Sequence, residues 1–219
     1  VVGRDEAAVV RAHAAAERRI AWSGARREPN SQPELLRSLP TIDRTIEHPG
    51  KAAAAKAVRR HDAVYTKPYI AHASIAPSCG LARFEAGKLT VWTHSQGVVP
   101  LRGAMARGLK MEPGDITVIH AHGAGCYGHN GADDAAFDAA VIACARPGET
   151  IRVLWTRHDE LAASPLGSAM VVTLSAGLDA DGRPTDWTNE LWSGPHGQRP
   201  GASGNINILS AFALPDQPE

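Results

Sequence analysis

The stretch Ile116-Thr-Val-Ile-His-Ala-His-Gly-Ala-Gly-Cys-Tyr-Gly-His-Asn-Gly-Ala-Asp-Asp134 joins a strand pattern to a helix pattern through a run of glycines. Residues 116–121 are predicted as a strand, and residues 132–145 as a helix that Arg146-Pro147-Gly148 ends. Two acidic residues lie in the first turn of this helix, where they favour the helix dipole, and the rest is small and apolar. Such a helix packs closely against a sheet, so this unit sets the expected fold.

The loop between these two elements, residues 122–131, is the predicted functional site and is called the glycine loop below. Its glycines at positions 123, 125, 128 and 131 allow positive φ angles and a close approach of the backbone to a ligand. The following helix adds unpaired N–H groups and the positive end of its dipole. An anionic cofactor is therefore the expected ligand.

Strand and helix signals alternate through the rest of residues 58–219, which predicts an α+β fold of mixed sheets with packed helices. The expected elements are strands at 58–70 (interrupted by Pro68), 89–93 and 151–156, a hairpin of 170–178 and 185–192, and a helix at 97–109. Residues 194–219 are rich in Gly, Pro and Ser and end without a closing element, which predicts either a loop within a larger protein or a disordered tail.

Residues 1–57 are predicted as a separate N-terminal helix followed by a Pro-rich linker, and residues 58–219 as the α+β domain. The helix is expected at 5–22 because Val9, Ala12, Ala16 and Ile20 share one face. Prolines at positions 29, 33, 40 and 49 interrupt the polar stretch that follows, in which only a short helix at 34–39 is expected. An alanine-rich turn at 51–57 leads into the domain.

Composition excludes several classes of partner. The 219 residues are 43% hydrophobic, which is enough for a core, and 23 basic and 23 acidic side chains give no net charge to attract nucleic acid or an anionic membrane. No apolar run is long enough to span a bilayer. The three cysteines match neither a disulfide framework nor a CxxC metal site, so unpaired thiols are expected. The chain starts at Val1 without a signal-peptide pattern, so we expect a piece of a longer protein, in the cytoplasm or on the periplasmic side of a bacterial inner membrane.

The glycine loop also matches a dinucleotide-binding fingerprint, Gly123-x-Gly125-x-x-Gly128, between a strand and a helix. In such folds an acidic residue about 20 positions on binds the ribose, whereas Asp159 and Glu160 lie roughly ten residues too late. An NAD(P)-binding Rossmann-type oxidoreductase domain stays open as an alternative. A tight turn whose glycines serve packing only is a second one.

Neither a protein-ligated metal nor a nucleophile is predicted. His120 and His122 share one face of the expected strand, and His129 lies across the loop, but no further ligand completes a metal set. Cys126 lies near a helix N-terminus, which would lower its pKa, although a small buried thiol is the commoner case. Ser78 and Ser95 lack the GxSxG pattern of a nucleophile elbow.

Three segments in this order resemble the large subunit of molybdenum hydroxylases, the xanthine dehydrogenase and aldehyde oxidase family. They are Tyr69-Ile-Ala-His-Ala-Ser-Ile-Ala-Pro-Ser-Cys-Gly-Leu-Ala82, Val91-Trp-Thr-His-Ser-Gln-Gly-Val-Val-Pro-Leu-Arg102 and the glycine loop. The branch with isoquinoline 1-oxidoreductase and nicotinate dehydrogenase large subunits is the most similar. The resemblance implies that the α+β domain is part of a molybdopterin-binding large-subunit architecture, in which the cofactor rather than the protein holds the metal.

The resemblance also implies roles for particular residues. Gln96 looks like the family glutamine that hydrogen-bonds the oxo group on molybdenum, a task for an uncharged donor. The loop residues whose backbone would approach the cofactor are Gly123, Ala124, Gly125, Cys126, Tyr127 and Gly128, with Cys126 and Tyr127 in place of the usual Phe-Gly. His129 and Asn130 are substrate-side candidates. Asn130 in place of a glutamate, and Ala76 where Glu-Pro is frequent, argue against purine substrates.

By the same resemblance, this segment holds no catalytic base, because the family's glutamate would lie beyond Glu219. The implied cofactor is molybdopterin, or its cytosine dinucleotide form, with molybdenum, and the implied substrate is an N-heterocycle or an aldehyde oxidised with oxygen from water. The implied partners are the remainder of the large subunit and a small subunit with iron–sulfur clusters. A catalytically silent interaction module stays open as a third alternative.

Overall fold

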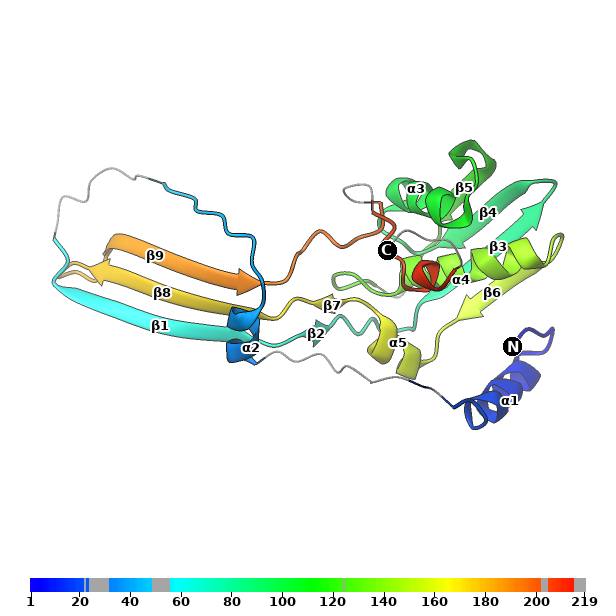
Figure 1. Ribbon diagram of the computed structural model, residues 1–219, viewed down its shortest axis with the longest axis horizontal. Coiled ribbons are helices and arrows are strands. Elements are labelled where there is room, and N and C mark those ends of the chain that lie inside the picture. The colour runs from blue at the N-terminus through cyan, green and yellow to red at the C-terminus, as the bar shows by residue number, and fades with distance from the viewer. Residues whose placement is uncertain (22, 24–31, 49–55, 124, 202–204, 215–219) are drawn as a thin grey trace. The chain divides into compact units, whose positions relative to one another are not determined.

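A computed structural model describes residues 1–21, 23, 32–48, 56–123, 125–201 and 205–214 (Figure 1). Contacts divide the chain into two units, Val1–Asn30 and Ser31–Glu219. The helices are α1 (Glu6–Glu17), α2 (Pro33–Ser38), α3 (Val98–Leu109), η1 (Pro113–Asp115), α4 (Ala132–Ala145), α5 (Arg157–Ala163) and η3 (Leu209–Ala213). The strands are β1 (Arg59–Lys67), β2 (Ile70–Ala71), β3 (Cys79–Glu85), β4 (Lys88–Thr93), β5 (Ile116–His120), β6 (Thr150–Leu154), β7 (Leu166–Gly167), β8 (Met170–Leu178) and β9 (Pro184–Ser193).

A four-stranded sheet in the order β5-β4-β3-β6 carries the site. β3 pairs antiparallel with both β4 and β6, and β5 is parallel to β4, so the sheet is mixed. The chain turns between β3 and β4 through Ala86 and Gly87, both with positive φ, as in the two-residue turns that suit a hairpin. β3 is not among the predicted strands, although it is a central one.

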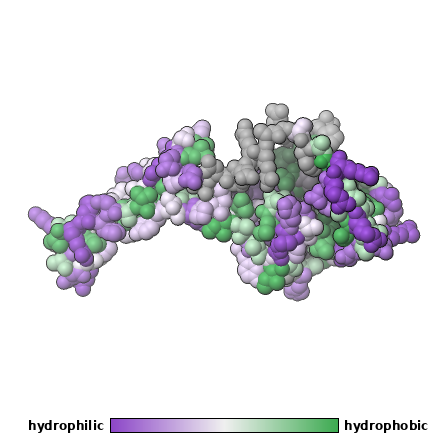
Figure 2. Space-filling view, turned by 90° about the horizontal axis from the view of Figure 1, so that it is seen from below, coloured by the Kyte–Doolittle hydropathy of each residue, from purple (hydrophilic) through white to green (hydrophobic). Residues whose placement is uncertain are grey.

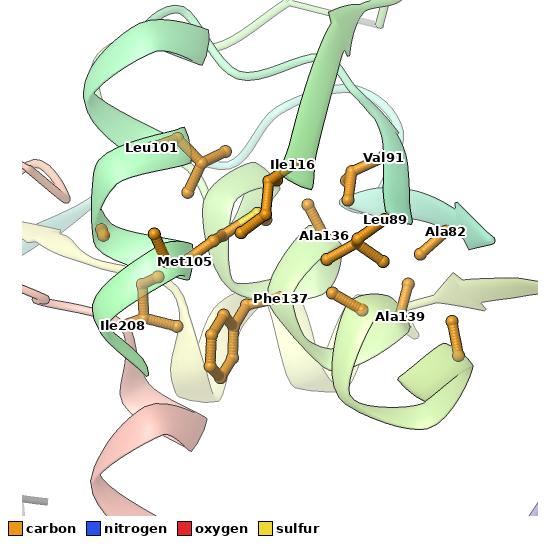
Figure 3. Packing of buried hydrophobic residues seen from close by; sticks show 14 of the residues in the cluster. Ala82, Leu89, Val91, Leu101, Met105, Ile116, Ala136, Phe137, Ala139 and Ile208 are labelled. Atoms are coloured by element: carbon orange, nitrogen blue, oxygen red, sulfur yellow. The ribbon is translucent and has the colours of Figure 1, made fainter. Parts of the chain in front are cut away.

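The core lies between one face of this sheet and the helices α3 and α4 (Figure 3). Alternate residues of β4, such as Leu89 and Val91, point to the helices, and Phe137 and Met105 are fully buried against them. The small side chains of α4 bring it close to the sheet, as the sequence predicts. The predicted helices at 97–109 and 132–145 are confirmed.

A second sheet has the order β1-β8-β9 and is antiparallel throughout. The predicted hairpin is confirmed, and β1 joins it from a distant part of the chain. A small cluster forms where α2 packs on this sheet through Leu36, and the Arg37 guanidinium lies 5.0 Å from the centre of a Trp192 ring. This helix precedes the domain boundary predicted at residue 57, and that division stays a prediction. Beyond the cluster the sheet exposes apolar side chains among polar ones, and the face shown in Figure 2 likewise mixes the two kinds.

Three predictions need correction. The N-terminal helix ends at Glu17 rather than at residue 22, and none of its residues is buried, so the expected apolar stripe does not form a core in the described part of the chain. The helix α5 is absent from the predicted elements, although Thr156 and Asp159 form a capping box at its start. Residues 205–214 are not a plain loop, because Ile208 is fully buried in the main core and η3 follows it. The predicted turn at 51–57 lies largely outside the described residues.

None of the described helices is long and apolar enough to cross a membrane.

Candidate functional site

Three stretches that are far apart in the sequence meet around one open pocket of about 470 Å³. They are the segment that leads into β3 with the first residues of that strand, the end of β4, and the start of the glycine loop after β5; Leu154 of β6 completes the lining. The lining residues are Ala76, Pro77, Cys79, Leu81, Trp92, Thr93, His94, Ala121, His122, Gly123 and Leu154. All three segments that carry the family resemblance therefore contribute to a single place in the fold.

His94 lies between this pocket and the start of the glycine loop. Its Nε2 accepts a hydrogen bond from the backbone N–H of Cys79 at 3.2 Å, and burial lowers the pKa of the imidazole. A neutral ring that accepts at Nε2 carries its hydrogen on Nδ1. A Cβ at Gly123 would lie 2.6 Å from the His94 ring, so the close contact requires glycine.

His72 supports the other end of the loop. Its Nδ1 lies 3.1 Å from the carbonyl oxygen of Tyr127, which only accepts, so Nδ1 carries the hydrogen. Burial is the main cause that lowers the pKa of His72. A Cβ at Gly128 would lie 2.2 Å from the same ring. Two rings whose environment favours the neutral form therefore lie directly against glycines of the loop.

The backbone of the glycine loop is shaped for contact with a ligand. Gly125 and Gly128 have φ angles of +86° and +140°, as the sequence predicts. Tyr127 has φ +53°, a left-handed conformation that costs a non-glycine residue about 1–2 kcal/mol. No described residue accepts a hydrogen bond from the backbone N–H groups of residues 125–129. Since most of these residues are exposed, the N–H groups are available to an anionic ligand.

The side chains of Cys126 and Asn130 hold the loop from within. The Cys126 thiol donates to the Gly128 carbonyl at 2.9 Å. Asn130 is 2% exposed; its amide donates to the Gly125 carbonyl at 3.2 Å, and its Oδ1 accepts from the backbone N–H of Ala132 at 3.3 Å. Both polar atoms of this predicted substrate-side residue are therefore used inside the chain.

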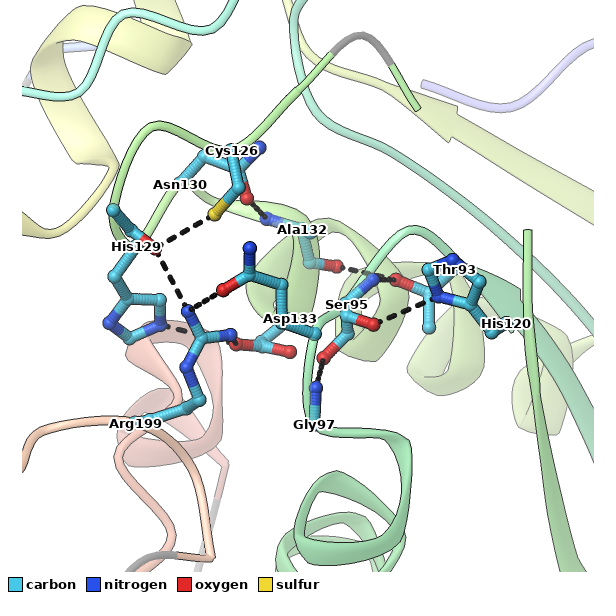
Figure 4. A network of polar contacts seen from close by, with 12 residues as sticks. Thr93, Ser95, Gly97, His120, Cys126, His129, Asn130, Ala132, Asp133 and Arg199 are labelled. Carbon is cyan, nitrogen blue, oxygen red and sulfur yellow. Dashed lines mark hydrogen bonds and ion pairs between the residues drawn. The ribbon is translucent and has the colours of Figure 1, made fainter. Parts of the chain in front are cut away.

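Arg199, which the sequence does not single out, connects the glycine loop to Gln96. Figure 4 shows its guanidinium beside His129 and Asp133. Its Nη2 donates to the Gly128 carbonyl at 3.0 Å and to Gln96 Oε1 at 3.2 Å, while Nη1 lies 3.6 Å from Asp133 Oδ2. The same carboxylate oxygen is 3.1 Å from His129 Nε2. Asp133 is 1% exposed and its Oδ1 has no partner among the described residues, so the Arg199 guanidinium compensates the charge of a buried acid.

The segment before β3 is held by the first turn of α5. Glu160 is fully buried, and its Oε2 accepts the backbone N–H of Ser78 at 2.8 Å. Arg157 donates to the carbonyl oxygen of Ser74 at 2.7 Å. These two side chains fix the segment before β3 that lines the pocket. No local sequence pattern indicates this role.

The site residues predicted from the sequence gather around the glycine loop. Gln96 follows β4 with an exposed side chain, and Gly123, Gly125, Cys126, Tyr127, Gly128, His129 and Asn130 form the loop. Ala124 lies outside the described residues. The structure adds four side chains to which the sequence assigns no role in the site: His72, His94, Asp133 and Arg199. The first three lie within or beside the segments that carry the resemblance, whereas Arg199 comes from the tail.

No group of three or more His, Cys, Asp or Glu side chains among the described residues could hold a metal ion. The His120 and His122 rings lie 5.8 Å apart, edge to face, and His120 Nδ1 donates to the Ser95 carbonyl. All three cysteines are free, as predicted.

The sheet order is unlike that of a Rossmann domain. The strands on either side of α4, β5 and β6, lie at opposite edges, with β4 and β3 between them, and β3 runs antiparallel to its neighbours. Asp159 accepts from the Thr156 backbone in the capping box, and Glu160 is buried against Ser78, so neither carboxylate is placed for a ribose. The dinucleotide alternative is therefore not favoured.

Comparison with known sequences identifies relatives over most of this chain. Residues 40–200 match the family described as molybdopterin cofactor-binding domain. A nicotinate dehydrogenase subunit of Pseudomonas putida is 36% identical over 189 residues, which are 83% of this chain and 15% of that protein. Aldehyde oxidoreductase molybdenum-binding subunit PaoC of Escherichia coli K12 is 28% identical over 145 residues, 65% of this chain and 19% of that protein. The chain thus spans less than a fifth of the length of these curated relatives.

Solved structures share the fold. Aldehyde oxidoreductase of Desulfovibrio gigas superposes with a TM-score of 0.50 at 17% identity, over 58% of this chain and 14% of that one. CO dehydrogenase of Oligotropha carboxidovorans gives 0.53 at 16% identity, over 62% and 17%. These structures confirm the predicted α+β class. The family match and the nicotinate dehydrogenase subunit confirm the predicted resemblance to molybdenum-dependent oxidoreductases. The chain belongs to the molybdopterin cofactor-binding domain family.

Proposed function

We propose that this chain forms one wall of a molybdopterin site in the large subunit of a molybdenum-dependent hydroxylase or dehydrogenase. The observation that carries the proposal is the meeting of three sequence-distant segments at one pocket, beside a loop whose backbone N–H groups at 125–129 have no acceptor among the described residues. Such a loop suits the anionic pterin phosphate because several backbone N–H groups can donate hydrogen bonds to the phosphate oxygens.

The residues present fit this cofactor. The rings of His72 and His94 lie against Gly128 and Gly123, where a Cβ would collide with them, so they support the loop backbone at both of its ends. The cofactor-contact residues we propose are Gln96 and the loop residues Gly123, Ala124, Gly125, Cys126, Tyr127 and Gly128, of which Ala124 lies outside the described part. Gln96 would offer an uncharged hydrogen-bond donor. His129 and Asn130 would act on the substrate side by holding the loop, through the bonds that each makes within it.

The bound cofactor would supply the oxidation chemistry, with oxygen derived from water. The chain's own residues orient the cofactor and exclude bulk solvent from one side of it. We propose an N-heterocycle or an aldehyde as the substrate, because a nicotinate dehydrogenase and an aldehyde oxidoreductase are among the relatives. The general base is proposed to belong to the remainder of the large subunit.

The relatives are named as subunits, which supports a partner chain. We propose that this partner is a small subunit with iron–sulfur clusters, which accept the electrons, and that the cofactor is the cytosine dinucleotide form of molybdopterin. Both are carried over from the resemblance in the glycine loop and in residues 69–102.

The test is metal and pterin analysis of the full-length protein purified with its small subunit. We expect molybdenum and a pterin in about equal amounts, with cytosine monophosphate released on hydrolysis of the cofactor. A correctly folded complex that contains neither molybdenum nor pterin would overturn the proposal and leave a silent interaction module. In the loaded enzyme, Gln96→Ala should lower turnover while leaving the melting temperature unchanged.

A further inference from the structure

The contact between Arg199 and Gln96 determines which end of the Gln96 amide faces the open side of the site. Arg199 Nη2 lies 3.2 Å from the amide. A guanidinium group carries only donors, so the atom that faces it must be the amide oxygen, Oε1. No described residue accepts a hydrogen bond from Gln96 Nε2. The amide therefore presents its NH₂ group, a donor, to whatever binds beside it.

The backbone around Gln96 is fixed independently of this contact. The Ser95 N–H donates to Thr93 Oγ1 at 3.2 Å, and the Gly97 N–H donates to Ser95 Oγ at 3.0 Å. Only the exposed Gln96 side chain is left without a fixed orientation by this turn. Arg199 supplies that orientation from a distant segment of the chain.

Arg199 also ties the amide to the glycine loop. The same Nη2 donates to the Gly128 carbonyl at 3.0 Å, and the ion pair with the buried Asp133 holds the guanidinium in place. The side chain of Arg199 is 27% exposed, so its hydrogen bonds are only partly open to competition from water. One planar group thus spans the two elements that would face the cofactor.

We propose that Arg199 is a positioning residue of the molybdenum site. It orients the Gln96 amide so that Nε2 is the donor toward the cofactor, and it fixes the position of this amide relative to the glycine loop. This inference rests on the proposed function. Without Arg199, the amide of Gln96 is free to rotate and to present Oε1, an acceptor, in place of the donor. A lysine at this position keeps the charge and three donors, but on a single nitrogen, so it cannot face Asp133 with one nitrogen while it donates to Gln96 and Gly128 with another.

The experiment uses the full-length enzyme with its partner subunit and compares Arg199→Met, Gln96→Ala and the double variant. Each protein is measured for molybdenum content, for the electron paramagnetic resonance spectrum of its reduced molybdenum centre, and for kcat and KM. The matched control is Arg107→Met, since Arg107 donates to the Asn205 carbonyl at 2.9 Å and so bonds to the same tail without a bond to Gln96.

We expect Arg199→Met to keep its molybdenum, to shift the spectrum in the same direction as Gln96→Ala, and to lower kcat about tenfold with little change in KM, the effect of losing one well-placed hydrogen bond. The double variant should lose no more than Gln96→Ala alone, and Arg199→Lys should lie between wild type and Arg199→Met. Arg107→Met should resemble wild type.

Two results would overturn the inference while leaving the proposed function intact: a wild-type spectrum and kcat in Arg199→Met when Gln96→Ala changes both, or losses that add in the double variant. If Arg199→Met loses its molybdenum, the spectrum and kcat of Arg199→Lys are compared with those of Gln96→Ala instead. Loss of molybdenum in both Arg199 variants would assign Arg199 to assembly of the site and overturn the inference. An unchanged spectrum and kcat in molybdenum-loaded Gln96→Ala would instead refute the role proposed for Gln96 itself.

Discussion

Gly80 of β3 lies so close to Ala136 of α4 that a Cβ on the glycine would be 2.4 Å from the Cα of the alanine. The same Cβ would lie 2.7 Å from the carbonyl oxygen of Ala135. The obstacle is helix backbone, which cannot rotate away as a side chain would. This contact sets the distance between the central strand and the helix that begins at the glycine loop, and so links the core to the site.

Gly80→Ala should therefore destabilise the protein strongly. We expect a loss in the free energy of unfolding at or above the upper end of the ~1–3 kcal/mol typical of overpacking. The measurement is chemical denaturation followed by tryptophan fluorescence. Gly114→Ala is the matched control, because a Cβ at Gly114 meets nothing within 4 Å and should change stability little. Equal stability of the two variants would show that α4 can move away from the sheet.

The sequence predicts well those elements whose signals are local. The helix α4 is predicted at its observed bounds because its acidic first turn and the Arg-Pro-Gly end are both contiguous with an unbroken apolar run. β3 escapes prediction because its alternation includes Gly80 and Ala82 on the buried face, where small residues give a weak hydrophobic signal. The Ala86-Gly87 turn that follows is the available clue.

The site is predictable only in part, for a related reason. The glycine loop and Gln96 stand out in the sequence, but the residues that hold them are distant in the chain or have no local pattern. Arg199 reaches Gln96 from 103 positions away, and Glu160 reaches Ser78 from 82. Ile208 enters the core from a tail rich in glycine and proline, with no period to reveal it. Long-range contacts of single side chains leave no trace in local propensity.

Replacement of Glu160 should release the segment that lines the pocket. Glu160→Ala leaves the buried N–H of Ser78 without an acceptor, which costs about 1–3 kcal/mol in the free energy of unfolding, whereas Glu160→Gln keeps an amide oxygen for that bond and should cost less. Denaturation curves of the two variants test this order. Glu149→Ala, which removes an exposed ion pair with Arg146, serves as the control and should cost less than about 1 kcal/mol. The reverse order of the two Glu160 variants would contradict the role of the bond.

Asp134 should make stability depend on pH. Burial raises the pKa of this carboxyl from 3.8 to about 6, against the opposing effect of the hydrogen bond from the Leu209 N–H. Because the folded-state pKa is raised, the stabilisation is complete below about pH 4 and is lost as the pH rises through 6. At about 1.4 kcal/mol per pKa unit, the loss amounts to roughly 3 kcal/mol.

Asp134→Asn stays neutral and can still accept from Leu209, so it should equal wild type near pH 4 and exceed it in stability above pH 6. Unfolding free energies measured from about pH 4 to about pH 8 give the comparison. The control is Asp181→Asn, at an exposed position of the turn between β8 and β9, which should leave the pH profile of wild type in place. A wild-type profile in Asp134→Asn would mean that another group titrates.

Gly128→Ala separates the local cost of a left-handed residue from the specific contact with His72. Both Gly128 (φ +140°) and Gly148 (φ +84°) have positive φ, but a Cβ at Gly128 would lie 2.2 Å from His72 Nδ1, whereas one at Gly148 meets nothing within 4 Å. Gly148→Ala should cost about 1 kcal/mol in unfolding free energy and leave cofactor binding unchanged. Gly128→Ala should force the His72 ring away, break its bond to the Tyr127 carbonyl and disorder the exposed N–H groups of the loop.

In the full-length enzyme with its partner subunit, we expect a severalfold lower molybdenum content for Gly128→Ala than for Gly148→Ala. The double variant His72→Ala;Gly128→Ala makes room for the new methyl group, so recovery of molybdenum in this variant would locate the defect in the contact with His72. Equal molybdenum content in Gly128→Ala and Gly148→Ala would rule this contact out as a determinant of the site.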